Sequence, residues 1–222
     1  MNARARLRNT ALKLTQKITH KNGLLTTTLT FEGREVEVYN GAGTALKVIE
    51  LFGDDDLCAD VKAEVLAHLL FVEPYSVVRA FEGDYSRLLA FVLFEVVTID
   101  IDGKHATAHA RAQNKRVIDW EQDADIINVS LRMAYGVCFA DIAQQVDFRE
   151  FCKMLSFAPR DTPISQAMYY RSAKPPAYRK GNEQAVREFN RLRKYWALDT
   201  EQDSVNTIDG AFNRLKEMAK NG

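Results

Sequence analysis

The amino-acid sequence predicts a mostly α, compact multi-helix domain with one or two small β-hairpins. Apolar residues recur at spacings of three and four along most of the chain, which places them on one face of a helix. Residues that begin helices, such as Asp147 and Thr162, precede several of these stretches, and Gly or Pro follows them. Runs of β-forming residues around short Gly-containing turns occur in only two places.

The bulk composition is that of a soluble protein without a preference for polyanions. With 46% hydrophobic and 27% charged residues the chain can form a core, and its formal net charge of zero gives no overall attraction to nucleic acid or anionic lipid. No window holds the roughly 18 apolar residues of a spanning helix. The wide spacing of Cys58, Cys138 and Cys152 argues against a disulfide framework or a zinc site, and it predicts reduced, buried thiols in a cytosolic protein.

We expect three parts: a basic helical extension (1–23), a main helical domain (24–199) and a C-terminal amphipathic helix (200–222). The apolar face of the extension is formed by Leu7, Ala11, Leu14 and Ile18. That of the last helix, from about Ser204 to Ala219, is formed by Ile208, Phe212 and Leu215. A basic amphipathic segment can contact a membrane or a partner, or it can remain a solvated extension.

Two stretches have the pattern of a β-hairpin. The first covers 25–38, where Gly33 supplies the positive φ of a tight turn. The second is a hairpin insert at 98–110, signalled by Asp102-Gly103. His105 and His109, four residues apart, lie in or near this insert. Without a third ligand nearby they are interpreted as surface histidines rather than a metal site.

Three helices are predicted in the first half of the main domain. Thr44 is expected to cap the first, which ends near Phe52. The second covers about 59–72, and the preceding Asp54, Asp55 and Asp56 lack the ligand spacing of a calcium loop. The third, about 85–97, is apolar almost all around and is therefore the predicted buried central helix.

The second half carries the clearest helix starts. Asp119 with Gln122 forms a predicted capping box for a helix that ends at Tyr135-Gly136. This helix has two apolar stripes and is expected to be sandwiched between neighbours. The first stripe is Ala124, Ile127, Leu131 and Ala134. The second stripe is Ile126, Val129 and Met133.

Three further helices follow. Asp147 caps one, with Glu150 at the capping-box position and Cys152 on the core side. Thr162-Pro163 begins a short helix that Pro175-Pro176 ends, and Asn182 begins a helix that reaches about Ala197.

The sequence contains no positive reason to propose an enzyme. It has no phosphate-binding glycine loop and no G-x-S-x-G elbow, and Asp123 and Asp125 lie on different sides of a helix. Cys152 as a nucleophile is the disfavoured alternative, because no His lies near it in sequence. We therefore expect no catalytic, cofactor-binding or metal-binding residues.

One region leaves a nucleic-acid reading open. The stretch from Arg171 to Lys194 is net basic and includes Tyr178. A solvated helix face balanced by acids elsewhere is the simpler interpretation. The nucleic-acid reading predicts binding that weakens steeply with salt.

The order of four segments is similar to a known family. They are Asp119 to Ile127 (DWEQDADII), Asp147 to Phe151 (DFREF), Tyr170 to Lys174 (YRSAK) and Leu192 to Leu198 (LRKYWAL). In this order they resemble the tail assembly chaperones of long-tailed bacteriophages, in the branch encoded between the major tail protein and the tape measure protein. The resemblance spans roughly 28–199, and it is most specific over 115–199.

The resemblance implies a non-enzymatic chaperone of the host cytoplasm. Its expected partners are the tape measure protein and the major tail protein, and self-association is a further expectation. Long helical partners are commonly held by apolar surfaces on or between helices. Adaptable candidates for such a surface are Met133, Met154 and Met168, although core packing is the simpler place for each.

Overall fold

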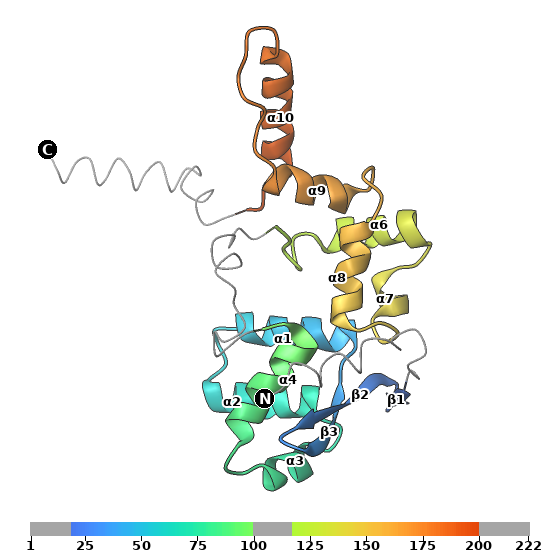
Figure 1. Cartoon of the computed structure of the whole chain (residues 1–222), viewed down its shortest axis with the longest axis vertical. Helices are drawn as coiled ribbons and strands as arrows, with labels where there is room; N and C mark the ends of the chain where they lie inside the picture. The colour runs from blue at the N-terminus through green and yellow to red at the C-terminus, as the bar shows by residue number, and fades with distance from the viewer. Residues whose placement is uncertain (1–18, 100–116, 200–222) are drawn as a thin grey trace, which may run out of the picture. The chain divides into compact units, whose positions relative to one another are not determined.

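The computed structural model describes residues 19–99 and 117–199, and it contains helices with one small antiparallel sheet (Figure 1). The predicted mostly α fold class is confirmed. The described residues form two compact units: unit 1 (19–99 and 135–157) and unit 2 (117–134 and 158–199). The predicted helices before 19 and after 199, most of the hairpin insert at 98–110, and both His105 and His109 lie outside the described residues.

The sheet begins unit 1 and contains the predicted hairpin. Its strands β1 (Thr19–Lys21), β2 (Leu24–Phe31) and β3 (Arg34–Tyr39) are antiparallel in the order β1-β2-β3. Glu32 and Gly33 both have positive φ, 50° and 81°, which is the twist that a two-residue hairpin turn needs.

The expected helical extension to residue 23 is wrong over β1. Asn22 and Gly23 form a second two-residue turn with positive φ, 54° and 76°, and Thr19 pairs with Thr26. Asn-Gly is the residue pair that such a turn prefers, so the chain folds back as a strand at this point.

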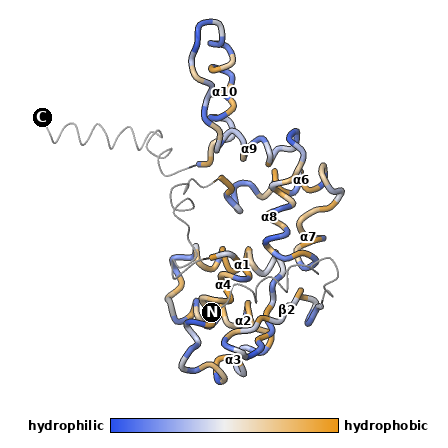
Figure 2. The backbone as a smooth tube through the Cα atoms, in the orientation of Figure 1, coloured by the Kyte–Doolittle hydropathy of each residue, from blue (hydrophilic) through white to orange (hydrophobic). Residues whose placement is uncertain are grey.

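Unit 1 is completed by helices α1 (Ala42–Gly53), α2 (Ala59–Leu70), α3 (Pro74–Ala80), α4 (Tyr85–Val97), α7 (Phe139–Ile142) and α8 (Phe148–Phe157). Helix α4 packs on α1, α8 and β2, and its Leu88, Val92 and Leu93 are fully buried. The predicted central helix is thus confirmed, and its apolar character is visible in Figure 2. Helix α3 was not predicted, because Pro74 suits the first turn of a helix as well as a break.

The predicted cap at Thr44 is wrong, because α1 begins two residues earlier. Its first amides are satisfied from a distant segment: Ala42 donates to the carbonyl of Val146 (2.9 Å) and Gly43 to that of Ala143 (2.8 Å). A Cβ on Gly43 would lie 2.9 Å from Nε2 of Gln144. The two glycines at 41 and 43 therefore permit a close backbone approach rather than breaking the chain.

Unit 2 contains most of α6 (Ala124–Tyr135), together with α9 (Pro163–Ser172) and α10 (Glu183–Tyr195). Thr162 and Asn182 directly precede α9 and α10 as predicted. The side chain of Asn182 bonds the loop before α10, at the Arg179 amide and the Ala177 carbonyl. Gly136, with φ of 71°, follows α6.

Candidate functional site

Among the residues that the structure describes, neither a metal-binding cluster nor a membrane-spanning helix is found. Within 19–99 and 117–199, no three His, Cys, Asp or Glu side chains are grouped so that they could hold a metal ion. The acidic triplet forms a local turn, in which Asp54 accepts a hydrogen bond from the Asp56 amide. None of the described helices is both long enough and apolar enough to cross a bilayer.

Cys58 is exposed, whereas Cys138 and Cys152 are both half-buried. Cys152 is half-buried, and burial together with the negative charge of Asp147 raises its pKa to about 11. A thiol with so high a pKa is almost entirely protonated at neutral pH, which opposes a nucleophilic role. The prediction of buried thiols is wrong for Cys58, which is exposed at the start of α2.

Asp123 and Arg171 form a buried ion pair in unit 2. The Asp123 carboxylate accepts hydrogen bonds from both terminal nitrogens of Arg171, at 2.6 and 2.8 Å. Arg171 also donates to the carbonyls of Val117 (2.9 Å) and Trp196 (2.5 Å). The side chains are only 7% and 3% exposed for Arg171 and Asp123. This arginine therefore joins the segment before α6 to α9 and to the end of α10.

The start of α6 differs from the predicted capping box. Asp119 does cap the turn, since its Oδ1 accepts from the amides of Glu121 and Gln122, but the helix begins only at Ala124. The capping box predicts that the Gln122 side chain accepts a hydrogen bond from the Asp119 amide. In the structure this acceptor is the Asp123 carboxylate. Gln122 instead exchanges two hydrogen bonds with the backbone of Asp199.

The predicted nucleic-acid region loses its first basic residue through this arrangement. Arg171 is committed to Asp123 and to two carbonyls, so it is not placed to contact phosphate. Its role could not be read from sequence, because the three segments that it connects are far apart along the chain. The paired acid Asp123 was visible only as one of several acids before α6.

The second apolar stripe of α6 is exposed, in contrast to the expected sandwich. Val129 and Met133 are 47% and 56% exposed, whereas Ile127 and Leu131 of the first stripe are buried. Ser130 lies between the stripes, accepts a hydrogen bond from the Ile164 amide (2.9 Å) and donates to the Ile126 carbonyl (2.6 Å). The helix is therefore fixed to α9 on one side and leaves apolar side chains uncovered on another.

The other two candidate methionines are less accessible. Met154 and Met168 are both half-buried. Of the three methionines named from the sequence, Met133 is the one that offers an open apolar surface.

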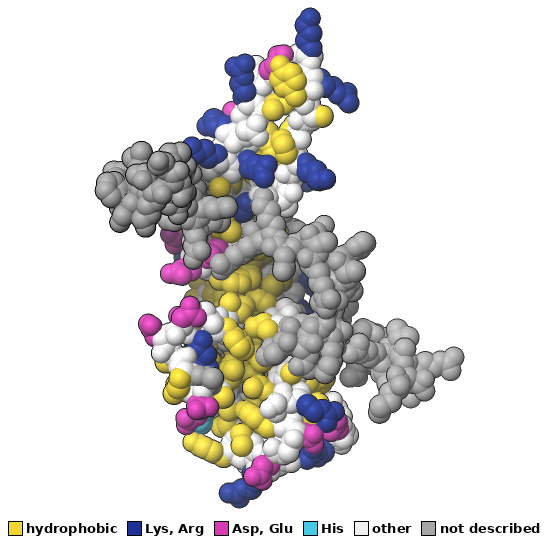
Figure 3. All heavy atoms as spheres, turned by 90° about the vertical axis from the view of Figure 1, so that its left-hand side faces the viewer, with side chains coloured by type: hydrophobic (Ala, Val, Ile, Leu, Met, Phe, Trp, Pro, Cys, Tyr) yellow, Lys and Arg dark blue, Asp and Glu magenta, His cyan; other side chains and the backbone are white. Residues whose placement is uncertain are grey.

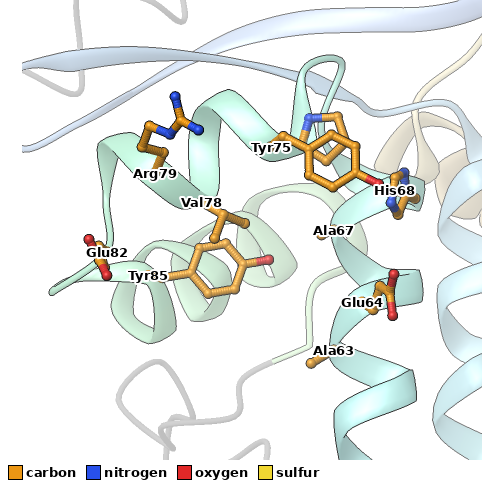
Figure 4. A pocket seen from close by; sticks show the side chains of 10 residues that line it. Ala63, Glu64, Ala67, His68, Tyr75, Val78, Arg79, Glu82 and Tyr85 are labelled. Carbon is orange, nitrogen blue, oxygen red and sulfur yellow. The ribbon is translucent and has the colours of Figure 1, made fainter.

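A pocket of about 570 Å³ lies between α2, α3 and the start of α4 (Figure 4). Small side chains on α2, Ala63 and Ala67, leave the space, and Val78 and Tyr85 form its apolar walls. Helix α3 has no buried side chain, so this wall is thinly packed. The Tyr85 hydroxyl is buried without a hydrogen-bond partner among the described residues, and burial raises its pKa.

Two acidic side chains line this pocket. Glu64 and Glu82 lie at its two ends in Figure 4, with Arg79 and His68 also lining it. The stretch 54–84 contains eight acids and two bases. The pocket thus combines an apolar interior with two acids and one base, on a stretch of chain that is net acidic.

A projecting, positively charged segment is found in unit 2. We call residues 174–196, the loop before α10 and α10 itself, the basic arm; it contains seven bases and two acids. Lys and Arg side chains gather there in Figure 3. Within α10 the only buried residue is Phe189, which packs against Tyr169 and Tyr170. Tyr178 and Tyr195 are 72% and 74% exposed.

Comparison with known proteins identifies a family. No curated protein matches the chain. No solved structure matches it either. The family model described as "Bacteriophage Gp15 protein" matches residues 22–198, a span that includes strands β2 and β3, the pocket, the Arg171 ion pair and the basic arm. Because this match covers most of the chain, the protein belongs to the bacteriophage Gp15 protein family.

Proposed function

We propose that this protein is a non-enzymatic tail assembly chaperone that binds the tape measure protein during phage tail morphogenesis in the host cytoplasm. The observation that carries the proposal is membership of a phage protein family over 22–198, the span in which the four ordered segments resemble tail assembly chaperones. The major tail protein is the second expected partner, because tail subunits assemble around the tape measure protein.

The exposed stripe of α6 suits a long helical partner. Val129 and Met133 lie four residues apart on one side of the helix, and Ile126 continues the stripe one turn earlier. Another amphipathic helix can pack its own apolar face on such a stripe. Methionine adapts to irregular neighbours, which is useful for a chaperone that meets many successive segments of one partner.

The proposal is tested by co-expression with the tape measure protein encoded by the same phage, followed by affinity purification. We expect the two proteins to co-purify, and we expect Val129→Lys with Met133→Lys to weaken recovery at least tenfold. A charge placed in an apolar contact loses the burial and must be desolvated. Failure of the unmodified protein to retain the tape measure protein would remove the proposed function.

A matched control uses an exposed valine elsewhere. Val61 on α2 is 41% exposed, close to the 47% of Val129, and it does not line the pocket. Val61→Lys should leave recovery unchanged. The single variant Val129→Lys is measured beside it, and equal losses for Val61→Lys and Val129→Lys would show that the α6 stripe is not the binding surface, even if the unmodified chain retains the tape measure protein.

A further inference from the structure

The charged residues of the pocket between α2 and α3 indicate what kind of surface fits it. In unit 1 the described residues include sixteen acids and eight bases. Around the pocket itself, Glu64 is exposed on α2 and Glu82 is exposed after α3. A partner surface must therefore provide an apolar or aromatic group together with positive charge.

The basic arm of unit 2 provides both groups on one helix face. Arg187, Arg191 and Tyr195 follow each other at intervals of four on α10, so they lie on the same side of the helix. All three are exposed, and Tyr195 contacts the edge of Trp196 at a ring-centroid distance of 5.0 Å. Tyrosine and arginine are the residue types that most often dominate protein interfaces.

We propose that the Arg187–Arg191–Tyr195 face of the basic arm docks into the α2–α3 pocket of a second copy of this chain. Tyr195 enters the apolar space beside Ala63, Ala67 and the Tyr85 ring, and the two arginines lie against Glu64 and Glu82. Each copy carries one arm and one pocket, so the contact is head-to-tail. Repeated contacts of this kind produce closed rings or open chains of subunits.

This inference is independent of the proposed function, because it concerns only copies of one chain. It predicts association that depends on salt, since exposed opposite charges are screened over about 8–10 Å at 0.1–0.15 M ionic strength. Sedimentation velocity and light scattering of the full chain should show oligomers at about 20 mM salt, and the population should shift to monomer at about 500 mM salt.

Charge reversal of each surface provides the decisive experiment. The arm variant is Arg187→Glu with Arg191→Glu, and the pocket variant is Glu64→Lys with Glu82→Lys. Each alone should raise the dissociation constant at least tenfold. Mixing the two variants should restore association, because the intact arm of one meets the intact pocket of the other and the reversed arm and reversed pocket are again opposite in charge.

Matched controls separate this contact from general charge effects and from misfolding. Lys47→Glu with Lys153→Glu changes the net charge as much as the arm variant, at exposed residues away from both surfaces, and should associate normally. Tyr195→Ser should weaken association, whereas Tyr178→Ser, at a ring with nearly the same exposure, should not. Thermal unfolding followed by circular dichroism checks that each variant is folded.

The following results would overturn the inference. One is an unmodified chain that stays monomeric at low salt and high concentration. Another is association that persists in both the arm variant and the pocket variant. A monomeric chain whose pocket variant loses tape measure binding would assign the pocket to that partner instead. A monomeric chain whose arm variant loses salt-dependent binding to a single-stranded oligonucleotide would assign the arm to nucleic acid. In both of these cases, the proposed chaperone role would be judged separately from the co-purification above.

Discussion

Arg171 and Arg191 belong to the same net-basic stretch of sequence, yet their environments are opposite. Arg171 is 7% exposed and donates to a carboxylate and two carbonyls. Arg191 is 69% exposed and pairs only with Glu188, three residues earlier on α10, among the contacts that the described residues provide. One arginine therefore organises unit 2 and the other is available at a surface. The number of basic residues in this stretch of sequence does not reveal which arginine is buried in an ion pair and which is exposed.

The largest loss of stability is expected from replacing the buried arginine, Arg171. Arg171→Met leaves the Asp123 carboxylate buried without its charge partner, and we expect a loss of about 3–5 kcal/mol in the free energy of unfolding. Urea denaturation of the purified chain measures the loss. The double variant Arg171→Met, Asp123→Leu should recover much of it, because two apolar groups replace two charges. A midpoint for Arg171→Met within error of the unmodified chain would contradict the structural role.

A smaller loss of stability is expected at Ser130, a buried uncharged side chain that also connects two helices. Ser130 joins α6 to the first turn of α9 through its bond with the Ile164 amide. Ser130→Ala leaves that amide without its acceptor and should lower the free energy of unfolding by about 1–3 kcal/mol. Ser156→Ala provides the control, because Ser156 is exposed and donates only within its own helix, to the Cys152 carbonyl. Equal effects of the two alanine substitutions would show that Ser130 does not connect the helices.

The smallest effect on stability is expected at the exposed arginine. Arg191→Met should leave the urea midpoint unchanged, because a solvent-exposed pair contributes little to folding. In the unmodified chain, the hydrogen bond from Arg191 lowers the pKa of the Glu188 carboxyl below the ordinary value of 4.5. The pair therefore acts at neutral pH and is lost as the pH falls through that lowered pKa. Titration of the Glu188 carboxyl by NMR should show its midpoint rising toward 4.5 in Arg191→Met.

Sequence patterns predicted the elements that depend on local chemistry. The hairpin at Glu32-Gly33 follows from a local turn signal, and the helix starts at Thr162 and Asn182 follow from residue types that favour the position before a helix. The bounds of α4 at Tyr85 and Val97 follow from its apolar pattern. The Asn22-Gly23 turn carried an equally local signal. It was missed because the basic amphipathic pattern before it was extended too far.

Features that depend on distant segments were not predictable in the same way. Thr44 was predicted as a cap from its residue type. The true start of α1 was missed, because the carbonyls that accept from its first amides belong to the distant residues Ala143 and Val146. The second stripe of α6 looked like a core face, since periodicity reveals an apolar side but not whether a neighbour covers it. The pocket likewise depends on how α3 is placed against α2, and nothing in the residues of α3 alone specifies that arrangement.

The junction between α1 and the α7 region has a consequence for synthesis on the ribosome. The amides of Ala42 and Gly43 find their acceptors about a hundred residues later in the chain. At translation rates of about 5–20 residues per second, those acceptors emerge roughly 5–20 s after the start of α1. During that interval the nascent sheet and the first four helices must wait, incompletely closed, for the segment that completes them. This junction can therefore form only after residues 143–146 have been made, although the amides that it pairs are made near the beginning.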